Sequence, residues 1–234
     1  MKKRIVITDL SRMKSDRVCI FGIDEERRPI RPVISDRGIR ERDLFDEERN
    51  QIIKPFAEVE FDFLRPLPKP SHTEDWEINM IYKPRLIRSL SEDERKAFLE
   101  VILDGSVKEI FGATIHENRY INLGEGKRSL GTIKAKEVLF VRYSMEEEGK
   151  CDYRIRFSDM NGDIYNLKVT DCAFRRYCDL ERIQNQKSMG LIGAELQRRF
   201  NQIEVYLRVG LARPFKDVHW LQISGVHTFP DYRV

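Results

Sequence analysis

Features that cross-link a chain or anchor it in a membrane are scarce in this sequence. Only four cysteines occur among 234 residues, without a CxxC pair, so neither a disulfide scaffold nor a zinc knuckle is predicted. The four histidines are scattered, and we expect no metal and no other cofactor. No apolar run approaches the roughly 18 residues of a membrane helix, and the first one ends at Ile7, too early for a signal peptide. We therefore expect a cytoplasmic protein without membrane contact.

Motifs of nucleotide-dependent and hydrolytic enzymes are also missing. The sequence contains no P-loop, no GxGxxG fingerprint and no GxSxG elbow. The glycine-containing stretch 122–127 lacks the glycine spacing of a phosphate cradle and is predicted to be a turn. Because no catalytic residues are recognised, the sequence favours binding over catalysis.

Charged residues are abundant, but neither sign dominates. They make up 35% of the chain, against roughly 25% in an average globular protein, and 42 Lys and Arg face 39 Asp and Glu for a formal net charge of +3. The hydrophobic share of 41% argues against disorder. This balance leaves two interpretations of the basic residues open, namely nucleic-acid contact and ion pairing on the surface.

Short alternating segments predict strands in both ends of the chain. In 56–64, for example, Val59, Phe61 and Phe63 alternate with acidic residues, which is the period of a half-buried strand. Asn161-Gly162 between two alternating runs predicts a hairpin. The two prolines of 29–34 favour an edge strand or an extended segment outside the hydrogen-bonded ladder. The other predicted strands cover 4–7, 17–23, 137–143, 153–157, 164–169, 205–211 and 219–226.

Helices are predicted in fewer places. Ser91 and Glu94 form a capping box before an apolar stripe, Asp171 can cap a second helix, and 191–200 has helical periodicity despite Gly193. Short strands without regular helix alternation suggest small barrels rather than a parallel sheet. We therefore predict a mainly β chain with two small barrels joined by a helical segment. The expected divisions are a first barrel at 1–76, a helical connector at 77–134 that could pack on it, and a second barrel at 135–234.

Basic and aromatic residues on the predicted strands are the main candidates for a binding site. Arg154 and Arg156 are two apart and must share a face of their strand. Such a face can follow a phosphate backbone while aromatic rings stack on bases. The residues assigned to phosphates are Arg28, Arg31, Arg154, Arg156 and Arg213, and those assigned to stacking are Trp76 and Trp220.

The sequence HTEDW at 72–76 is a second candidate. It is interpreted as a ligand-contact loop in which His72, Glu74 and Asp75 meet the ligand beside Trp76. The alternative is a connector in which Trp76 fills the core and a polar side chain caps a turn.

Three carboxylates in 56–64 raise a third possibility. Glu58, Glu60 and Asp62 share one strand face, and clustered oxygen ligands suit the magnesium ions of two-metal nucleases. The alternative is a solvated face opposite arginines of a neighbouring strand.

Seven stretches of the sequence resemble the dual OB-containing domain family, a prokaryotic family. They are ITDLSRM (7–13), DRVCIFGID (16–24), RPV (31–33), PFAEVEF (55–61), HTEDW (72–76), HWLQISGV (219–226) and TFPDY (228–232). The resemblance spans nearly the whole chain. It implies two tandem OB-type barrels, nucleic-acid binding and an association with defence systems, and it supplies no catalytic residues.

These observations rank three functions. The first is binding of single-stranded DNA or RNA by the two barrels, through phosphate contacts and stacking. The second is a protein-interaction adaptor that binds a partner protein without nucleic acid, which the balanced charge favours. The third is a metal-dependent nuclease centred on Glu58, Glu60 and Asp62.

Overall fold

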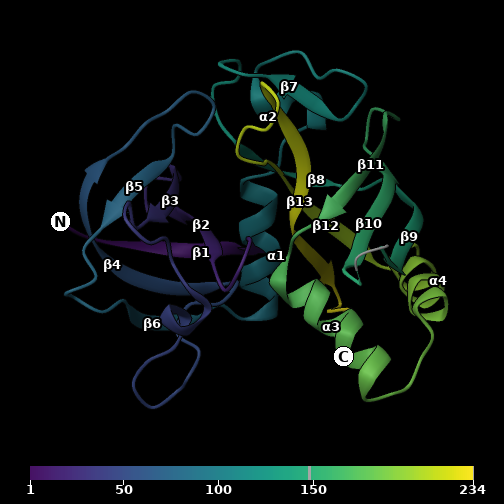
Figure 1. Ribbon diagram of the computed structural model, residues 1–234, viewed down its shortest axis with the longest axis horizontal. Coiled ribbons are helices and arrows are strands. Elements are labelled where there is room, and N and C mark those ends of the chain that lie inside the picture. Colours follow the sequence, from purple (N-terminus) through teal and green to yellow (C-terminus); the bar gives the residue numbers. More distant parts are fainter. Residues whose placement is uncertain (147–148, 234) are drawn as a thin grey trace. The chain divides into compact units, whose positions relative to one another are not determined.

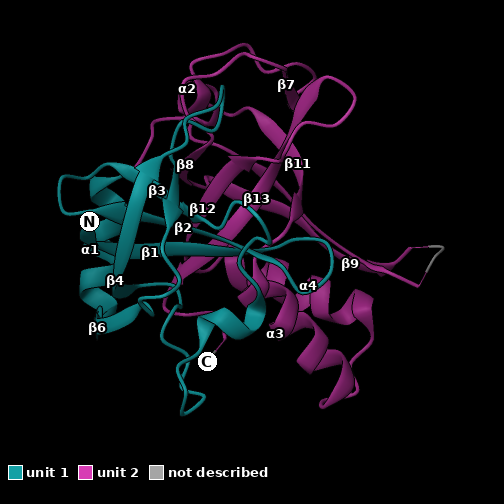
Figure 2. Ribbon diagram, turned by 60° about the vertical axis from the view of Figure 1, so that its left-hand side comes forward, with its two compact units in different colours: residues 1–102 teal, residues 103–234 magenta. Residues whose placement is uncertain are grey.

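The computed structural model describes residues 1–146 and 149–233 and divides into two compact units, 1–102 and 103–234 (Figure 2). Strands predominate in both units, which confirms the predicted mainly β class (Figure 1). None of the described helices has the length and apolar character needed to cross a membrane. The segment 77–134, expected as one helical connector, is shared between the units and contains three short strands beside its two helices.

Unit 1 is a closed five-stranded barrel. Its strands follow the order β1-β2-β3-β5-β4, and β4 pairs back with β1. All pairs are antiparallel except β3–β5, which is parallel. The strands are β1 (Lys2–Arg12), β2 (Val18–Asp24), β3 (Pro29–Val33), β4 (Ala57–Pro66), β5 (Asp75–Ile78) and β6 (Arg85–Ser89), the last of which pairs with β4; the helices are η1 (Glu41–Leu44) and α1 (Glu92–Val101).

Alternation along the strands explains how this barrel forms. On β4, Val59, Phe61 and Phe63 are buried, so the apolar face predicted from the sequence is the core face. A register shift between Ile7 and Asp9 of β1 marks a bulge, which bends a strand. The long bent β1 can therefore pair with β4 near its start and with β2 further along, which closes the ring.

The prediction of an edge strand at 29–34 was wrong. β3 lies between β2 and β5, although it contains Pro29 and Pro32. Pro29 is the first residue of the strand, where a missing N–H is tolerated. The pairing with β2 ends at Ile30, so the absent N–H of Pro32 breaks no ladder on that side.

Unit 2 repeats the strand order of unit 1. Its strands follow β9-β10-β11-β13-β12, and the pair β11–β13 is parallel. β8 pairs with β12 and is separated from β9 by two residues, so β8 and β9 together occupy the place that β1 has in unit 1. The strands are β7 (Tyr120–Asn122), β8 (Leu130–Lys134), β9 (Glu137–Met145), β10 (Cys151–Ser158), β11 (Ile164–Val169), β12 (Glu204–Leu211) and β13 (Val218–Phe229); the helices are α2 (Val107–Phe111), α3 (Cys172–Ile183) and α4 (Met189–Phe200).

Three local predictions are confirmed. The hairpin predicted at Asn161-Gly162 joins β10 to β11, although only Gly162, with a φ of 85°, has the left-handed conformation, so the connection is a longer turn with glycine at its left-handed position. Ser91 and Glu94 form both hydrogen bonds of the capping box of α1. α4 continues through Gly193. The lack of a side chain there lets the helix pack on β9, because a Cβ atom would overlap the carbonyl oxygen of Val141.

Asp171 joins α3 to β13 in the core of unit 2. Its carboxylate accepts hydrogen bonds from the backbone N–H groups of Ala173 (2.8 Å), Phe174 (3.4 Å) and Val226 (2.7 Å). Burial raises the pKa of this carboxyl group from 3.8 to about 6, and the three N–H donors offset only part of that effect. The folded state therefore binds the Asp171 proton more tightly than the unfolded state.

This shift predicts a pH dependence of stability. The tighter binding of this proton in the folded state stabilises the protein. This stabilisation is fully present below about pH 4 and is lost as the pH rises through about 6, which lowers the free energy of unfolding by up to about 3 kcal/mol. In Asp171→Asn the amide does not titrate, so this part of the pH dependence should vanish. Urea denaturation of both proteins between about pH 4 and pH 7 measures the difference, and parallel pH profiles would contradict the assignment.

Candidate nucleic-acid interface

Four cations meet on the outward face of β9, β10 and β11, which lie side by side in Figure 1. Arg154 of β10 is directly opposite Arg142 of β9 and Lys168 of β11. Directly opposite residues share one face of a sheet, and the intervening residues on these strands, such as Ile155, are buried. Arg156 shares this face with Arg154, as predicted from their spacing. We call Arg142, Arg154, Arg156 and Lys168 the basic face.

A single buried carboxylate organises three of these cations. Asp152 has a side chain only 3% exposed, and its oxygens lie 3.2 Å from Arg154 Nε, 3.6 Å from Arg142 Nε and 3.9 Å from Lys168 Nζ. Like charges directly opposite each other in a sheet repel. Glu146 lies 3.8 Å from Lys168 Nζ as well, so two carboxylates are set against the four cations of the basic face. The net charge stays positive, and the basic face can accept a further anion.

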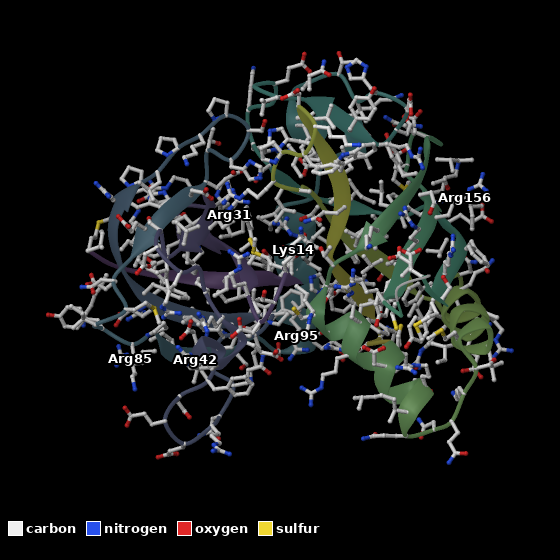
Figure 3. All side chains as sticks on the ribbon, viewed as in Figure 1. Lys14, Arg31, Arg42, Arg85, Arg95 and Arg156 are labelled. Atoms are coloured by element: carbon white, nitrogen blue, oxygen red, sulfur yellow. The ribbon has the colours of Figure 1, made fainter. Side chains whose placement is uncertain are left out.

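Arg156 and Phe140 complete the face. Arg156 is exposed and forms no ion pair within 1–146 and 149–233, and Figure 3 shows its side chain pointing away from the strands. Phe140 lies directly opposite Arg156 on β9 and is 52% exposed. A cation and a bare aromatic ring are thus adjacent, which is the combination that binds the phosphates and bases of a single strand.

The opposite side of these strands is held rigidly against α3. The hydroxyl groups of Tyr143 and Tyr153 donate to Asp179 over 2.6 and 2.8 Å, and their rings stack with centroids 5.0 Å apart. Burial and the neighbouring Asp179 raise the pKa of both phenols well above the ordinary value of 10. Both tyrosines therefore remain protonated donors. Their hydrogen bonds to Asp179 link β9 and β10, on the side opposite the basic face, to α3.

The other residues assigned to phosphates and stacking are dispersed. Arg28 is engaged by Asp24 (2.9 Å) and Glu26 (2.7 Å). Trp76 is half-buried on β5, edge-to-face with Phe63 and 4.7 Å from the Lys3 ammonium. Arg213 and Trp220 are exposed in unit 2, in the β12–β13 turn and on β13 respectively.

Arg31 is buried, and so are three residues of the HTEDW segment, His72, Glu74 and Asp75. Arg31 is 5% exposed, and its Nε donates to the carboxylate of Asp75, directly opposite it on the parallel pair β3–β5. The Arg31 N–H donates to the Glu74 carbonyl over 2.8 Å. These contacts hold β5 in the barrel of unit 1, and we leave the four residues out of the interface.

The three carboxylates of β4 face cations from neighbouring groups. Glu58 lies 3.0 Å from Arg88 and Glu60 lies 3.4 Å from Arg85, both on β6. Asp62 accepts a hydrogen bond of 2.9 Å from the N-terminal ammonium of the chain. This is the cross-strand ion pairing given as the alternative to a nuclease site, and the described residues contain no group of three or more His, Cys, Asp or Glu placed to hold a metal.

Sequence reasoning missed Phe140, Arg142, Asp152 and Lys168. All four lie on outward positions of strands, and alternation would have placed each one on the outward side of its own strand. Their association depends on the register between strands, which the sequence pattern alone does not reveal.

The shared strand order, with its parallel third and fifth strands, defines a protein of two OB-type domains, of which unit 1 is a closed barrel and unit 2 has the corresponding sheet. In that class the face of the second and third strands binds oligonucleotides and oligosaccharides, and in unit 2 those strands are β10 and β11. The chain belongs to the dual OB-containing domain family, whose model matches residues 3–226. The predicted fold class and resemblance are thus confirmed. No curated protein matches the chain.

Proposed function

We propose that the protein binds single-stranded nucleic acid through the basic face of unit 2. The observation that carries this proposal is the register that brings Arg142, Arg154 and Lys168 into one row around Asp152. A row of cations suits a row of phosphates, and the exposed Phe140 offers a surface for a base. The position of the face on the second and third strands of an OB-type barrel supports the same assignment.

We further propose that the protein acts in a prokaryotic defence system, as the family resemblance implies. The cytoplasmic location expected from the sequence is part of this proposal, because nucleic acid is accessible there. Chemistry on the strand is not part of the proposal, which concerns binding only.

A protein partner is the second candidate. Leu180 and Ile183 on α3 and Leu191 on α4 are exposed apolar residues, and exposed apolar surface is typical of interaction sites. Purification with a stoichiometric partner protein and with the absorbance ratio of protein alone would favour this function.

Salt dependence is the first test of the proposal. Single-strand binding that neutralises three or four phosphates has a slope of about −2 to −3 in log K against log salt. Raising the salt from about 50 to about 200 mM should therefore weaken binding roughly 20- to 50-fold. Fluorescence anisotropy with labelled DNA and RNA oligomers measures the slope. A flat titration at low salt would refute the proposal, as would affinity that does not change with salt.

A further inference from the structure

Three aromatic rings, Trp220, Tyr120 and His116, form a row near the start of β13. Trp220 lies directly opposite Tyr120 of β7, and their ring centroids are 5.4 Å apart. His116 stacks on Tyr120 at 5.3 Å with an interplanar angle of 21°. Trp220 ends the row and is 39% exposed. The two inner rings support it, so that it offers a large aromatic surface in a fixed position.

This aromatic row is continuous with the basic face. Lys168 of β11 is directly opposite Gln222 of β13, and Gln222 is two residues beyond Trp220. Residues two apart share a face and are about 7 Å apart along a strand, and the adjacent Leu221 and Ile223 are buried in the core. Trp220 and Lys168 therefore lie on the same outward surface of unit 2.

The short strand β7 makes this continuity possible. One edge of β13 bonds to β11 through the Thr170 N–H, which donates to the Ile223 carbonyl over 2.7 Å. Two residues earlier in β13, the same edge pairs with β7 instead of β11. There the Leu221 N–H donates to the Arg119 carbonyl over 2.8 Å. Figure 1 shows β7 at that end of β13. β7 lies outside the five-strand order of the barrel, so it is an addition that widens this surface.

Cations flank the aromatic row. Arg213 and Lys216 are exposed in the β12–β13 turn, which begins where the Ala212 N–H donates to the Trp220 carbonyl over 2.8 Å. Arg119, next to Tyr120, is exposed as well. The same two segments contribute the acidic residues Glu117 and Asp217, so their local charge is positive by one unit. The local charge suits a polyanion.

We propose that Trp220 stacks on an unpaired base of a strand whose phosphates lie on the basic face. This inference rests on the proposed function and narrows its ligand to strands with accessible bases. In a duplex the bases are stacked and paired with each other, so their faces are not free for Trp220. Alanine substitution of one base-stacking aromatic commonly costs a factor of about 5 to 150 in affinity, and Trp220→Ala should fall in that range.

Tryptophan fluorescence provides the test, because the chain has only two tryptophans. Trp76→Phe leaves Trp220 as the sole reporter in its native surroundings, and Trp220→Phe leaves Trp76 as the matched control on unit 1. A single-stranded oligomer should quench the emission of the first variant at saturation and leave that of the second unchanged. A duplex of equal length should not quench Trp220, and neither should an abasic strand, which keeps the phosphates but has no bases.

The outcomes separate the two proposals. If anisotropy shows no binding of any strand, the proposed function fails. If single-stranded oligomers bind with the expected salt slope but Trp220 emission is unchanged, binding at the basic face is supported and stacking on Trp220 is refuted. Equal quenching by abasic and normal strands would also refute stacking, because the signal would then arise without a base.

Discussion

Replacing Arg154 and Arg156 together by glutamate is expected to weaken single-strand binding by on the order of 100-fold or more at low salt. The two substitutions change the charge by four units on a face where Arg142 and Lys168 are the remaining cations. The phosphates that the two arginines attract in the native protein would be repelled by the two glutamates. Both side chains are on the outward face of β10, Arg156 exposed and Arg154 half-buried beside the buried Asp152, so a circular dichroism spectrum of the variant must match that of the native protein before its binding is compared. Anisotropy titrations with one labelled oligomer measure the loss.

A matched control separates this local effect from net charge. Arg176 on α3 and Arg198 on α4 are exposed arginines of the same unit, and their double replacement by glutamate changes the charge by the same amount. We expect that variant to bind within a few-fold of the native protein. Equal losses in the two double variants would show that the basic face has no special role.

Asp75→Ala is expected to lower the free energy of unfolding by about 3–5 kcal/mol. The substitution removes the carboxylate that Arg31 Nε bonds and leaves a buried guanidinium beside β5. An uncompensated buried charge is costly because the low dielectric around it does not replace its hydration. Since the pair joins the parallel strands β3 and β5, its removal should weaken the strand pairing that closes the unit 1 barrel. Urea denaturation followed by circular dichroism measures the change.

The double variant Arg31→Met with Asp75→Leu tests the cause. Replacing both members of a buried ion pair by apolar residues is often close to neutral, so this variant should be more stable than Asp75→Ala alone. If it is as unstable as the single variant or worse, the loss comes from packing or from other contacts of Asp75, and the charge argument fails.

Local patterns in the sequence were sufficient for much of unit 2. Alternation predicted β9, β10 and β11, the Asn161-Gly162 turn joined the last two, and a period of two placed Arg154 and Arg156 on one face. Each of these inferences depends on neighbours within a few positions, where backbone geometry and side-chain direction are coupled directly.

Features that depend on pairing between distant segments were not predictable in the same way. Asp75 and Trp76 lie in a segment that reads as a loop, yet they form β5 because β3 and β4 supply its hydrogen bonds. Tyr120 and Trp220 are far apart in the sequence and meet only because β7 joins the edge of β13. The propensity of so short a strand is weak, and its pairing partners decide its structure.

Photo-cross-linking of a single strand carrying bromouracil or thiouracil bases, followed by peptide mapping, locates the bound strand on the protein. We expect cross-linked peptides from 137–169, which contain Phe140 and the basic face, and from 218–229, which contain Trp220. Cross-links confined to unit 1, or to α3 and α4, would contradict this expectation, because the strand would then lie away from the surface that the register of β9, β10 and β11 creates.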